Sequence, residues 1–462
     1  MSEEIKRVEF TAEMKKTYKI LFPNMLTIHF IILKGVFKGL GYDVELLTTT
    51  DRAIVDEGLK SVHNDTCYPA LLVIGQFIHA LKSGKYDVNK TALLLTQTGG
   101  GCRASNYIHL LRKALVKAGF PQVPVISLNP AGLEKNSGFV IDLKTIRRAM
   151  AAVAYGDFIT ALHNQAKAYE RKKGTSQALV DKWCAFLSDR LEAGKDASGS
   201  AIRFNMKKIA HDFSAIPLDK SLIGKKPKVG IVGEIYVKYA PLANNSLEDF
   251  LYSEGCEVNV PGLLGFLLYV FDNNIIDVEL YGGKMSKKIA NLLLRTYLES
   301  YEKMIRKNIS DAGFAAPLPH SRVRELGKES VGLGCKMGEG WLLTAEMYAL
   351  CEEGYDNIIC VQPFGCLPNH IVGKGMIRAI RRRHPDANIV TVDYDPGATK
   401  VNQENRIKLM LSVAREKIEA RESGKSSNTG SPVYTRADEN STRVQGKENV
   451  AGRDEDKVLD AR

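Results

Sequence analysis

The chain has 462 residues, of which 44% are hydrophobic and 25% charged, and its formal net charge is +11. These proportions are typical of folded globular proteins, and the length allows two or three domains, since single cores rarely grow beyond about 250–300 residues. The positive charge is spread along the chain, with no basic helix interleaved with aromatics and no zinc-finger spacing. We therefore expect no nucleic-acid partner; an anionic small molecule or an acidic protein would use the same charge.

The amino-terminal residues and the cysteine content favour a cytoplasmic protein that does not enter a membrane. Residues 1–19, MSEEIKRVEFTAEMKKTYK, lack the apolar stretch of a secretory signal, and the apolar run at 26–33 is too short to span a bilayer. Eight cysteines are too sparse for a disulfide scaffold in a chain of this length. We expect them to be mostly reduced thiols.

The pattern of residues 1–140 predicts a first α/β domain. From residue 18, KILFPNM, a helical stretch to about residue 37, and GLGYDVELL indicate strand, helix, strand. A loop then enters an amphipathic helix ending near residue 81. Residues 91–96 follow as a strand, and residues 107–119 as a helix. Between these last two lies TGGGCRAS, and a glycine loop between strand and helix directs backbone N–H groups at a negative guest.

The rest of the chain predicts a helical insert or lid at 141–225 and a second α/β domain at 226–421. KVGIVGEIY, NSLEDFLYSEG and CEVNVPG repeat the element order of the first domain about 210 residues later. After about residue 422 the composition turns to Ser, Asn, Thr, Gly and alternating charges, which predicts a disordered tail at 422–462. The expected fold class is thus α/β, with two similar Rossmann-like (flavodoxin-like) parallel-sheet domains, a helical insert and a disordered tail.

Three cysteines from distant segments share loop surroundings: Cys67 in HNDTCYPA, Cys102 in TQTGGGCRASNY and Cys366 in QPFGCLPNH. Glycines and prolines beside the thiols place them in loops, and Cys366 at a strand's carboxyl end, where open α/β sheets bind ligands. One interpretation is three exposed thiols without a shared role. The other is a soft-ligand metal cluster with three thiolates and one open position. The chain has no CxxC pair, so neither a zinc knuckle nor a dithiol oxidoreductase is predicted, and ferredoxin spacing is absent.

The other five cysteines are expected to pack rather than to react. Cys184 and Cys351 lie in helical patterns, and packing is also favoured for Cys256 and Cys335. Cys360 lies on the strand before Cys366, where a buried side chain is the ordinary expectation and a role near the cluster is the alternative.

With their flanks, several segments resemble those of acyl-CoA dehydratase activase-related proteins. The segments are DTCYPA, TQTGGGCRASNY, GEGWLLTAEM, QPFGCLPNHIVGKG and DYDPGATKVNQENRIKLML. Such proteins are similar to the 2-hydroxyacyl-CoA dehydratase subunit superfamily and to the carboxyl-terminal part of large predicted CoA-substrate-specific activases. The resemblance runs from about residue 18 to about residue 415. It implies that Cys67, Cys102 and Cys366 hold a 4Fe-4S cluster with one open iron, or a larger double-cubane cluster.

The resemblance also implies partners. The chain has neither the Asp-x-Gly-Ser-Thr-x-x-Lys motif of an activase nor a Walker loop, so a separate ATP-dependent activase is expected to deliver the electron. A CoA thioester is the expected substrate, and a homo- or heterodimer the expected assembly. Whether the chain is itself catalytic, as a dehydratase-like lyase or a reductase component, stays open.

The residues expected around the cluster are glycines whose amides approach sulfur and polar neighbours of the ligands. They are Gly100, Gly101, Arg103, Asn106, Asn369 and His370, with structural loop capping as the alternative. Glu339 is a possible acid/base group, although a carboxylate at a helix start is the commoner explanation. The rival hypotheses are a noncatalytic electron-relay or assembly partner of such an enzyme, and a metal-free or zinc-binding module.

Overall fold

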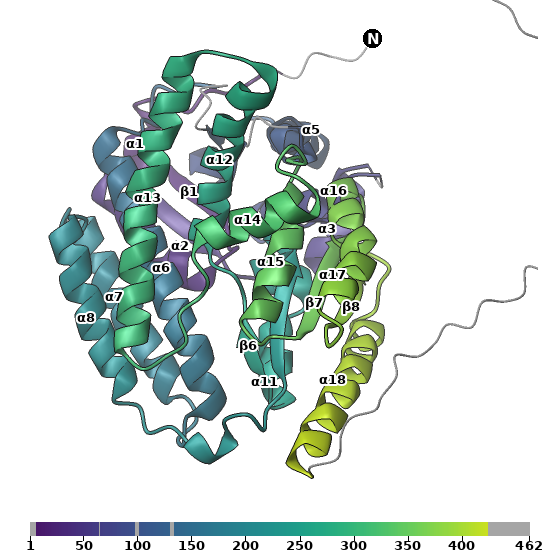
Figure 1. Ribbon diagram of the computed structural model, residues 1–462. Coiled ribbons are helices and arrows are strands. Elements are labelled where there is room, and N and C mark those ends of the chain that lie inside the picture. Colours follow the sequence, from purple (N-terminus) through teal and green to yellow (C-terminus); the bar gives the residue numbers. More distant parts are fainter. Residues whose placement is uncertain (1–5, 64, 98–100, 130–133, 424–462) are drawn as a thin grey trace, which may run out of the picture. The chain divides into compact units, whose positions relative to one another are not determined.

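The structure is a computed structural model that describes residues 6–63, 65–97, 101–129 and 134–423. These residues form two four-stranded sheets in which all strands run parallel (Figure 1). The predicted α/β class with two parallel sheets is confirmed. The predicted disordered tail lies outside the described residues from residue 424 onward.

The first sheet has the strand order β2-β1-β3-β4. Its strands are β1 (Lys19–Pro23), β2 (Asp43–Leu47), β3 (Thr91–Thr96) and β4 (Val125–Leu128). Ile20 at the centre of the sheet pairs with both Val44 and Ala92, and it is fully buried. The accompanying helical elements are α1 (Met14–Thr17), α2 (Thr27–Gly39), α3 (Ala53–Ser61), α4 (Tyr68–Lys82), η1 (Val88–Lys90), η2 (Arg103–Asn106) and α5 (Tyr107–Ala118).

The second sheet repeats this arrangement with the order β6-β5-β7-β8. Its strands are β5 (Lys228–Gly233), β6 (Glu257–Asn259), β7 (Asn357–Pro363) and β8 (Asn388–Tyr394). Each sheet places its first strand second from one edge, as flavodoxin-like sheets do. Its helical elements are η3 (Lys220–Leu222), α9 (Ile235–Tyr239), α10 (Pro241–Asn244), α11 (Leu247–Ser253), α14 (His320–Ser330), α15 (Gly340–Glu352), α16 (Leu367–Val372), η4 (Lys374–Met376), α17 (Ile377–Arg383) and α18 (Lys400–Glu422).

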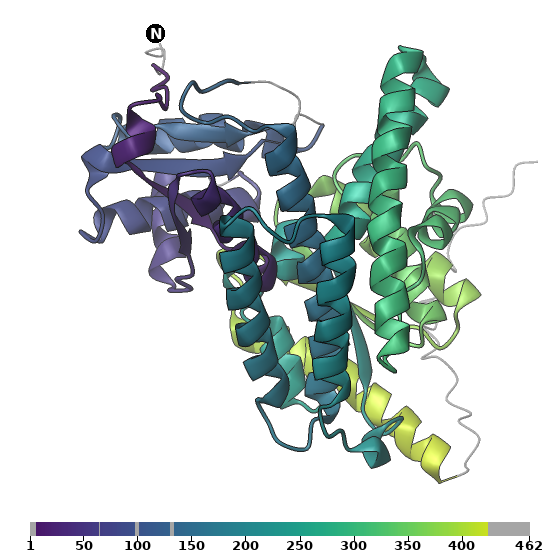
Figure 2. The ribbon, with the colours of Figure 1, turned by 90° about the vertical axis from the view of Figure 1, so that its left-hand side faces the viewer.

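Long helices fill the region predicted to be a helical insert: α6 (Leu143–Tyr169), α7 (Thr175–Glu192) and α8 (Gly199–Ser214). They share one apolar core with α2 and with two later helices, α12 (Leu263–Tyr281) and α13 (Met285–Asp311) (Figures 1 and 2). This shared core joins segments on both sides of the predicted insert, and the domain boundaries themselves stay a prediction. No helix among those described combines the length and apolar character that crossing a membrane requires.

Asp157 on α6 forms hydrogen bonds with both α2 and the start of α12. Its Oδ1 accepts hydrogen bonds from His29 Nε2 of α2 at 2.7 Å and from Leu263 N at 2.8 Å, and its Oδ2 accepts one from Leu264 N at 2.7 Å. The carboxylate thus satisfies two N–H groups at the start of α12, which have no partner within that helix.

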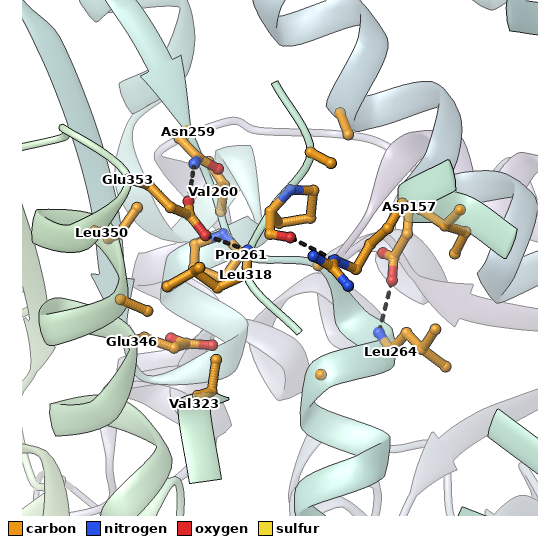
Figure 3. A pocket seen from close by; sticks show the side chains of 18 of the residues that line it. Asp157, Asn259, Val260, Pro261, Leu264, Leu318, Val323, Glu346, Leu350 and Glu353 are labelled. Carbon is orange, nitrogen blue, oxygen red and sulfur yellow. Dashed lines mark hydrogen bonds between the residues drawn. The ribbon is translucent and has the colours of Figure 1, made fainter. Parts of the chain in front are cut away.

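A cavity of about 240 Å³ lies between α6, the start of α12, the segment 315–323 and α15 (Figure 3). Its walls are largely apolar, and the carboxylates among them are engaged by the protein. Glu353 accepts hydrogen bonds from Leu318 N at 2.6 Å and Asn259 Nδ2 at 3.2 Å, and Glu346 is 3.2 Å from Lys238 Nζ. These carboxylates therefore stabilise the fold around the cavity.

Candidate functional site

Each of the three loop cysteines is the residue directly before a helical segment. Cys67 precedes α4, Cys102 precedes η2 and Cys366 precedes α16. Backbone N–H groups of the turn that follows lie near each sulfur and lower the pKa of its thiol, because they stabilise the thiolate. These groups belong to Ala70, Ala104 and Asn369.

The loops that carry Cys67 and Cys366 are in direct contact, although 299 positions separate them in the sequence (366 minus 67). Tyr68 N donates a hydrogen bond to Phe364 O at 3.0 Å. Gly365 has φ +77°, and a Cβ at this position would lie 3.0 Å from Cys67 Cα. Only glycine therefore fits here, both for its backbone conformation and for the close approach of the other loop.

The segment 335–340 lies between the Cys102 loop and the Cys366 loop. Met337 fills the space beside Gly101, and a Cβ on Gly338 would lie 3.3 Å from Pro368 Cβ of α16. Negative charge on Cys67 raises the pKa of Cys102, and negative charge on Cys102 raises the pKa of Cys366. The three thiols thus lie within electrostatic range of one another.

The carboxyl groups of Glu234 and Glu339 meet at the start of α9 and lie near the three cysteines. Glu339 Oε1 accepts a hydrogen bond from Ile235 N at 2.9 Å, and Glu234 Oε2 accepts one from Val237 N at 2.9 Å. Burial, and then the charge of Glu339, raise the pKa of Glu234 to about 8. Burial also raises the pKa of Glu339. Near neutral pH the pair therefore retains a proton.

Burial is the largest cause that raises the pKa of all three thiols. The charges of Glu339 and Glu234 raise the pKa of Cys102 further, to about 11, and raise that of Cys366 as well. The metal-free protein therefore holds neutral thiols at pH 7. A bound cation would reverse this, because metal ions bind the thiolate and release its proton.

Tyr107, the first residue of α5, contributes a hydroxyl to the site. Its oxygen lies 2.8 Å from Cys67 Sγ, and the side chain is buried. Burial, followed by the charges of Cys67 and Glu234, raises the pKa of Tyr107 well above its ordinary value. The phenol keeps its proton and can donate it to a Cys67 thiolate.

Of the residues predicted to surround the cluster, Arg103 is exposed, and its Nη1 donates to Asp65 O at 2.5 Å. Its charge lowers the pKa of Cys67. Asn106 is exposed at the start of α5, where its side chain makes no capping hydrogen bond. Gly101 is exposed beside Met337, and Gly100 lies outside the described residues.

Asn369 and His370 follow Cys366 on α16. Asn369 is fully buried: its Nδ2 donates to Val361 O at 3.4 Å, and its Oδ1 accepts from Cys360 Sγ at 3.8 Å. The Asn369 side chain thus holds α16 against β7. Cys360 is fully buried in the core of that sheet. His370 is half-buried.

Within the described ranges, no three His, Cys, Asp or Glu side chains are gathered closely enough to hold a metal ion. A four-iron cluster is larger than one ion, and each of its cysteines binds a different iron atom. The donor set fits such a cluster in its chemistry, because it consists of three soft sulfur ligands in a buried, acid-rich site.

The sequence patterns did not point to Glu234 or Tyr107. Glu339 lies at a helix start as predicted, directly before α15, but its side chain makes no capping hydrogen bond in that helix. Glu234 directly follows β5, so the rule that ligands lie at the carboxyl ends of parallel strands would have found it. Tyr107 is buried, and only the fold brings it to Cys67.

One known family matches part of the first α/β segment. Residues 19–88 match the CoA enzyme activase uncharacterised domain. The matched stretch runs from β1 to η1 and contains Cys67. It supports a relationship to CoA enzyme activases, whereas membership of the dehydratase subunit superfamily stays a prediction. No curated protein matches the chain.

Proposed function

We propose that the chain is an iron-sulfur protein of the 2-hydroxyacyl-CoA dehydratase type, with Cys67, Cys102 and Cys366 as the cluster ligands. The observation that carries the proposal is the grouping of three thiols from distant segments beside Glu234 and Glu339. Thiolates beside carboxylates need a cationic partner. The match to a CoA enzyme activase domain supports the class of substrate.

Zinc fits the ligand set less well than a cluster with an open iron. Structural zinc takes four ligands, commonly from CxxC pairs, and the chain has no such pair. Three cysteines without a fourth match a cluster that leaves one iron free. When bound, a cluster of this kind stores and passes single electrons at low potential.

The side chains around the cysteines have two tasks in this proposal. Hydrogen bonds from backbone N–H groups and from the Tyr107 hydroxyl stabilise the thiolates and raise the reduction potential. The carboxyl pair of Glu234 and Glu339 opposes this effect when ionised, and it stores a proton when neutral. Loss of water from a 2-hydroxyacyl thioester requires a proton for the departing hydroxyl, and the pair supplies it.

The proposed partner is a separate ATP-dependent activase that delivers one electron. The electron returns at the end of each dehydration, so the reaction needs no net reductant. Oxygen would oxidise a cluster of such low potential. We therefore propose a role in anaerobic metabolism.

Replacement of one ligand tests the proposal. Cys102→Ala should abolish the visible absorption of protein purified without oxygen, whereas Cys184→Ala, a change in the buried core of α7, should retain it. A wild-type protein without visible absorption, or an unchanged Cys102→Ala spectrum, would contradict the assignment. Turnover of 2-hydroxyacyl-CoA with an activase then separates a catalyst from an electron relay, which would show the absorption without turnover.

A further inference from the structure

The segment that follows Cys366 forms a basic hollow on the surface. Helix α16 begins directly after this cysteine, and η4 and α17 follow it in the chain (Figure 1). A shallow hollow of about 500 Å³ opens beside η4 and α17. It is lined by Lys374, Gly375, Ile377, Arg378, Arg381 and Arg382, and we call it the basic hollow. Four of these six residues are cationic, and none is acidic.

Three of the four cations are free of carboxylates. Lys374, Arg378 and Arg382 are exposed, and in the part of the chain that the structure describes none of them forms a salt bridge. Arg381 donates a hydrogen bond from Nη2 to Ile389 O at 3.0 Å, which fixes its guanidinium beside the hollow. The carboxylates on neighbouring segments pair with other cations: Glu329 with Arg383 at 2.8 Å, Asp386 with Lys417 at 3.6 Å, and Asp393 with Arg406 at 3.6 Å.

The spacing of the free cations favours a ligand with several negative charges. Lys374, Arg378 and Arg382 follow one another at intervals of four residues, which brings their side chains to one side of the helical segment. Like charges at this spacing repel one another and destabilise a helix. An anion bound in the basic hollow would remove this repulsion, and one with several charges would remove most of it.

The shape of the basic hollow favours a small polyanion over a nucleic acid or a membrane. Proteins that bind nucleic acids commonly contact about 6–10 phosphates along an extended surface. The basic hollow offers four cations in one depression. A bilayer surface is met by side chains that project from a protein, whereas these side chains line a concave surface.

Apolar side chains connect the basic hollow to the cluster ligand. Leu367 and Ile371 on α16 lie between Cys366 and Lys374 in the chain, and they are 68% and 56% exposed. Arg378 is 12 positions after Cys366 (378 minus 366), which corresponds to at most about 24 Å of helix. A CoA thioester has its parts in the same order: the reacting carbonyl, a weakly polar pantetheine arm, and then a diphosphate and a 3′-phosphate.

We propose that the basic hollow binds the phosphates of a CoA thioester, with the pantetheine arm lying along α16 toward Cys366. This assignment rests on the proposed function, which makes a CoA thioester the substrate. The guanidinium groups of Arg378 and Arg382 bind phosphate oxygens through paired hydrogen bonds, and Lys374 adds a point charge. The 3′-phosphate, a monoester, carries about −1.5 to −2 charge at pH 7 and gains most from these cations.

The test uses the full chain, purified without oxygen, and calorimetric titration with acetyl-CoA, which has no 2-hydroxyl group to lose. Arg378→Gln and Arg382→Gln should each raise the Kd for acetyl-CoA about 10-fold or more, because each removes a charged hydrogen-bond donor. Arg383→Gln is the matched control. Arg383 is exposed on the same helix but pairs with Glu329 outside the basic hollow, so its loss should change the Kd by less than about 3-fold.

ADP as a second probe distinguishes a CoA thioester from a free adenine nucleotide, since both carry a diphosphate and only the thioester has the arm. ADP should bind at least about 10-fold more weakly than acetyl-CoA. Ile371→Ser should weaken acetyl-CoA binding about 3-fold or more and leave ADP binding unchanged, because the arm loses an apolar contact.

Three results would overturn the proposal. They are a wild-type Kd for acetyl-CoA above about 1 mM, Arg378→Gln and Arg382→Gln variants that bind like the wild type, and ADP binding as tight as that of acetyl-CoA. The replaced side chains are exposed, so unchanged thermal unfolding will show that each variant is folded. Binding of single-stranded DNA or of phosphatidylglycerol vesicles that Arg378→Gln abolishes, in protein that does not bind acetyl-CoA, would also refute it.

The iron content of the same samples separates this inference from the proposed function. Protein that contains iron and does not bind acetyl-CoA would refute the assignment of the basic hollow alone. Protein that binds acetyl-CoA through Arg378 and Arg382 but contains no iron would refute the cluster and leave the basic hollow as a CoA site.

Discussion

At the scale of single residues, the cysteines could be found from sequence and their electrostatic neighbours could not. Glycine and proline beside Cys67, Cys102 and Cys366 identify loops, and this information is local. The proximity of Glu234 to Glu339 joins segments 105 positions apart (339 minus 234), and local patterns contain no such information. The property that distinguishes the site, carboxyl groups beside thiols, therefore became visible only in the fold.

The carboxyl pair predicts how stability depends on pH. The pKa of Glu234 is about 8 in the folded protein, against an ordinary value of 4.5. Between pH 4.5 and pH 8 the folded state therefore keeps a proton on this carboxyl that the unfolded chain has released. Stability contributed by this group is full below pH 4.5 and falls as the pH rises to 8, by at most about 1.4 kcal/mol per pH unit.

Glu234→Gln should therefore reduce that slope and stabilise the metal-free protein at pH 8, because the amide oxygen can still accept from Val237 N. Urea unfolding between pH 5 and 8 measures the slope. The exposed Glu416→Gln serves as the control and should leave it unchanged. Equal slopes for wild type and Glu234→Gln would show that this carboxyl does not hold the proton.

At the scale of elements, the strong local patterns were predicted well and the packing-dependent features were not. The predicted strand at 91–96 and helix at 107–119 correspond to β3 and α5. The helix predicted to be amphipathic before residue 81 is α4, and it is buried on almost every side. The side of α4 that was expected to face solvent packs against the later segment that contains α9 and α10. Helix α12, in the apolar stretch after residue 262, was not predicted because a continuous apolar run does not distinguish helix from strand.

The contact between the Cys67 and Cys366 loops gives a prediction at this scale. Gly365→Ala should cost about 1–3 kcal/mol, because φ is +77° and the new Cβ meets the Cys67 backbone, and it should lower the iron content by separating the loops. Gly354→Ala shares the positive φ (+81°) but meets nothing within 4 Å, so it should cost about 1 kcal/mol and keep the iron. Urea unfolding and iron quantitation measure both. Equal iron content in the two variants would show that the loop contact does not position the ligands.

At the scale of the whole molecule, the repeated order of elements predicted two similar sheets. Gly41 and Gly255, each just before a strand, both have positive φ, so the repeat includes the turn geometry. The way in which the helices join the two halves of the chain was not predictable. The packing of these helices depends on buried polar contacts such as those of Asp157. No local residue pattern predicts such contacts.

Asp157→Ala should destabilise the protein by about 3–5 kcal/mol. It leaves His29 Nε2 and the N–H groups of Leu263 and Leu264 buried without an acceptor. Chemical denaturation measures the loss. Asp189→Ala, on the exposed side of α7, should change stability by less than about 0.5 kcal/mol. A loss below about 1 kcal/mol for Asp157→Ala would mean that this carboxylate does not join the helices.

The most direct test of the central claim is the amount of iron and acid-labile sulfide in protein purified without oxygen. We expect equal amounts of both, about four of each per chain for a single cubane, and a loss of both when Cys67, Cys102 and Cys366 are replaced together by serine. Protein that contains zinc or no metal, or a triple variant that retains its iron, would contradict it.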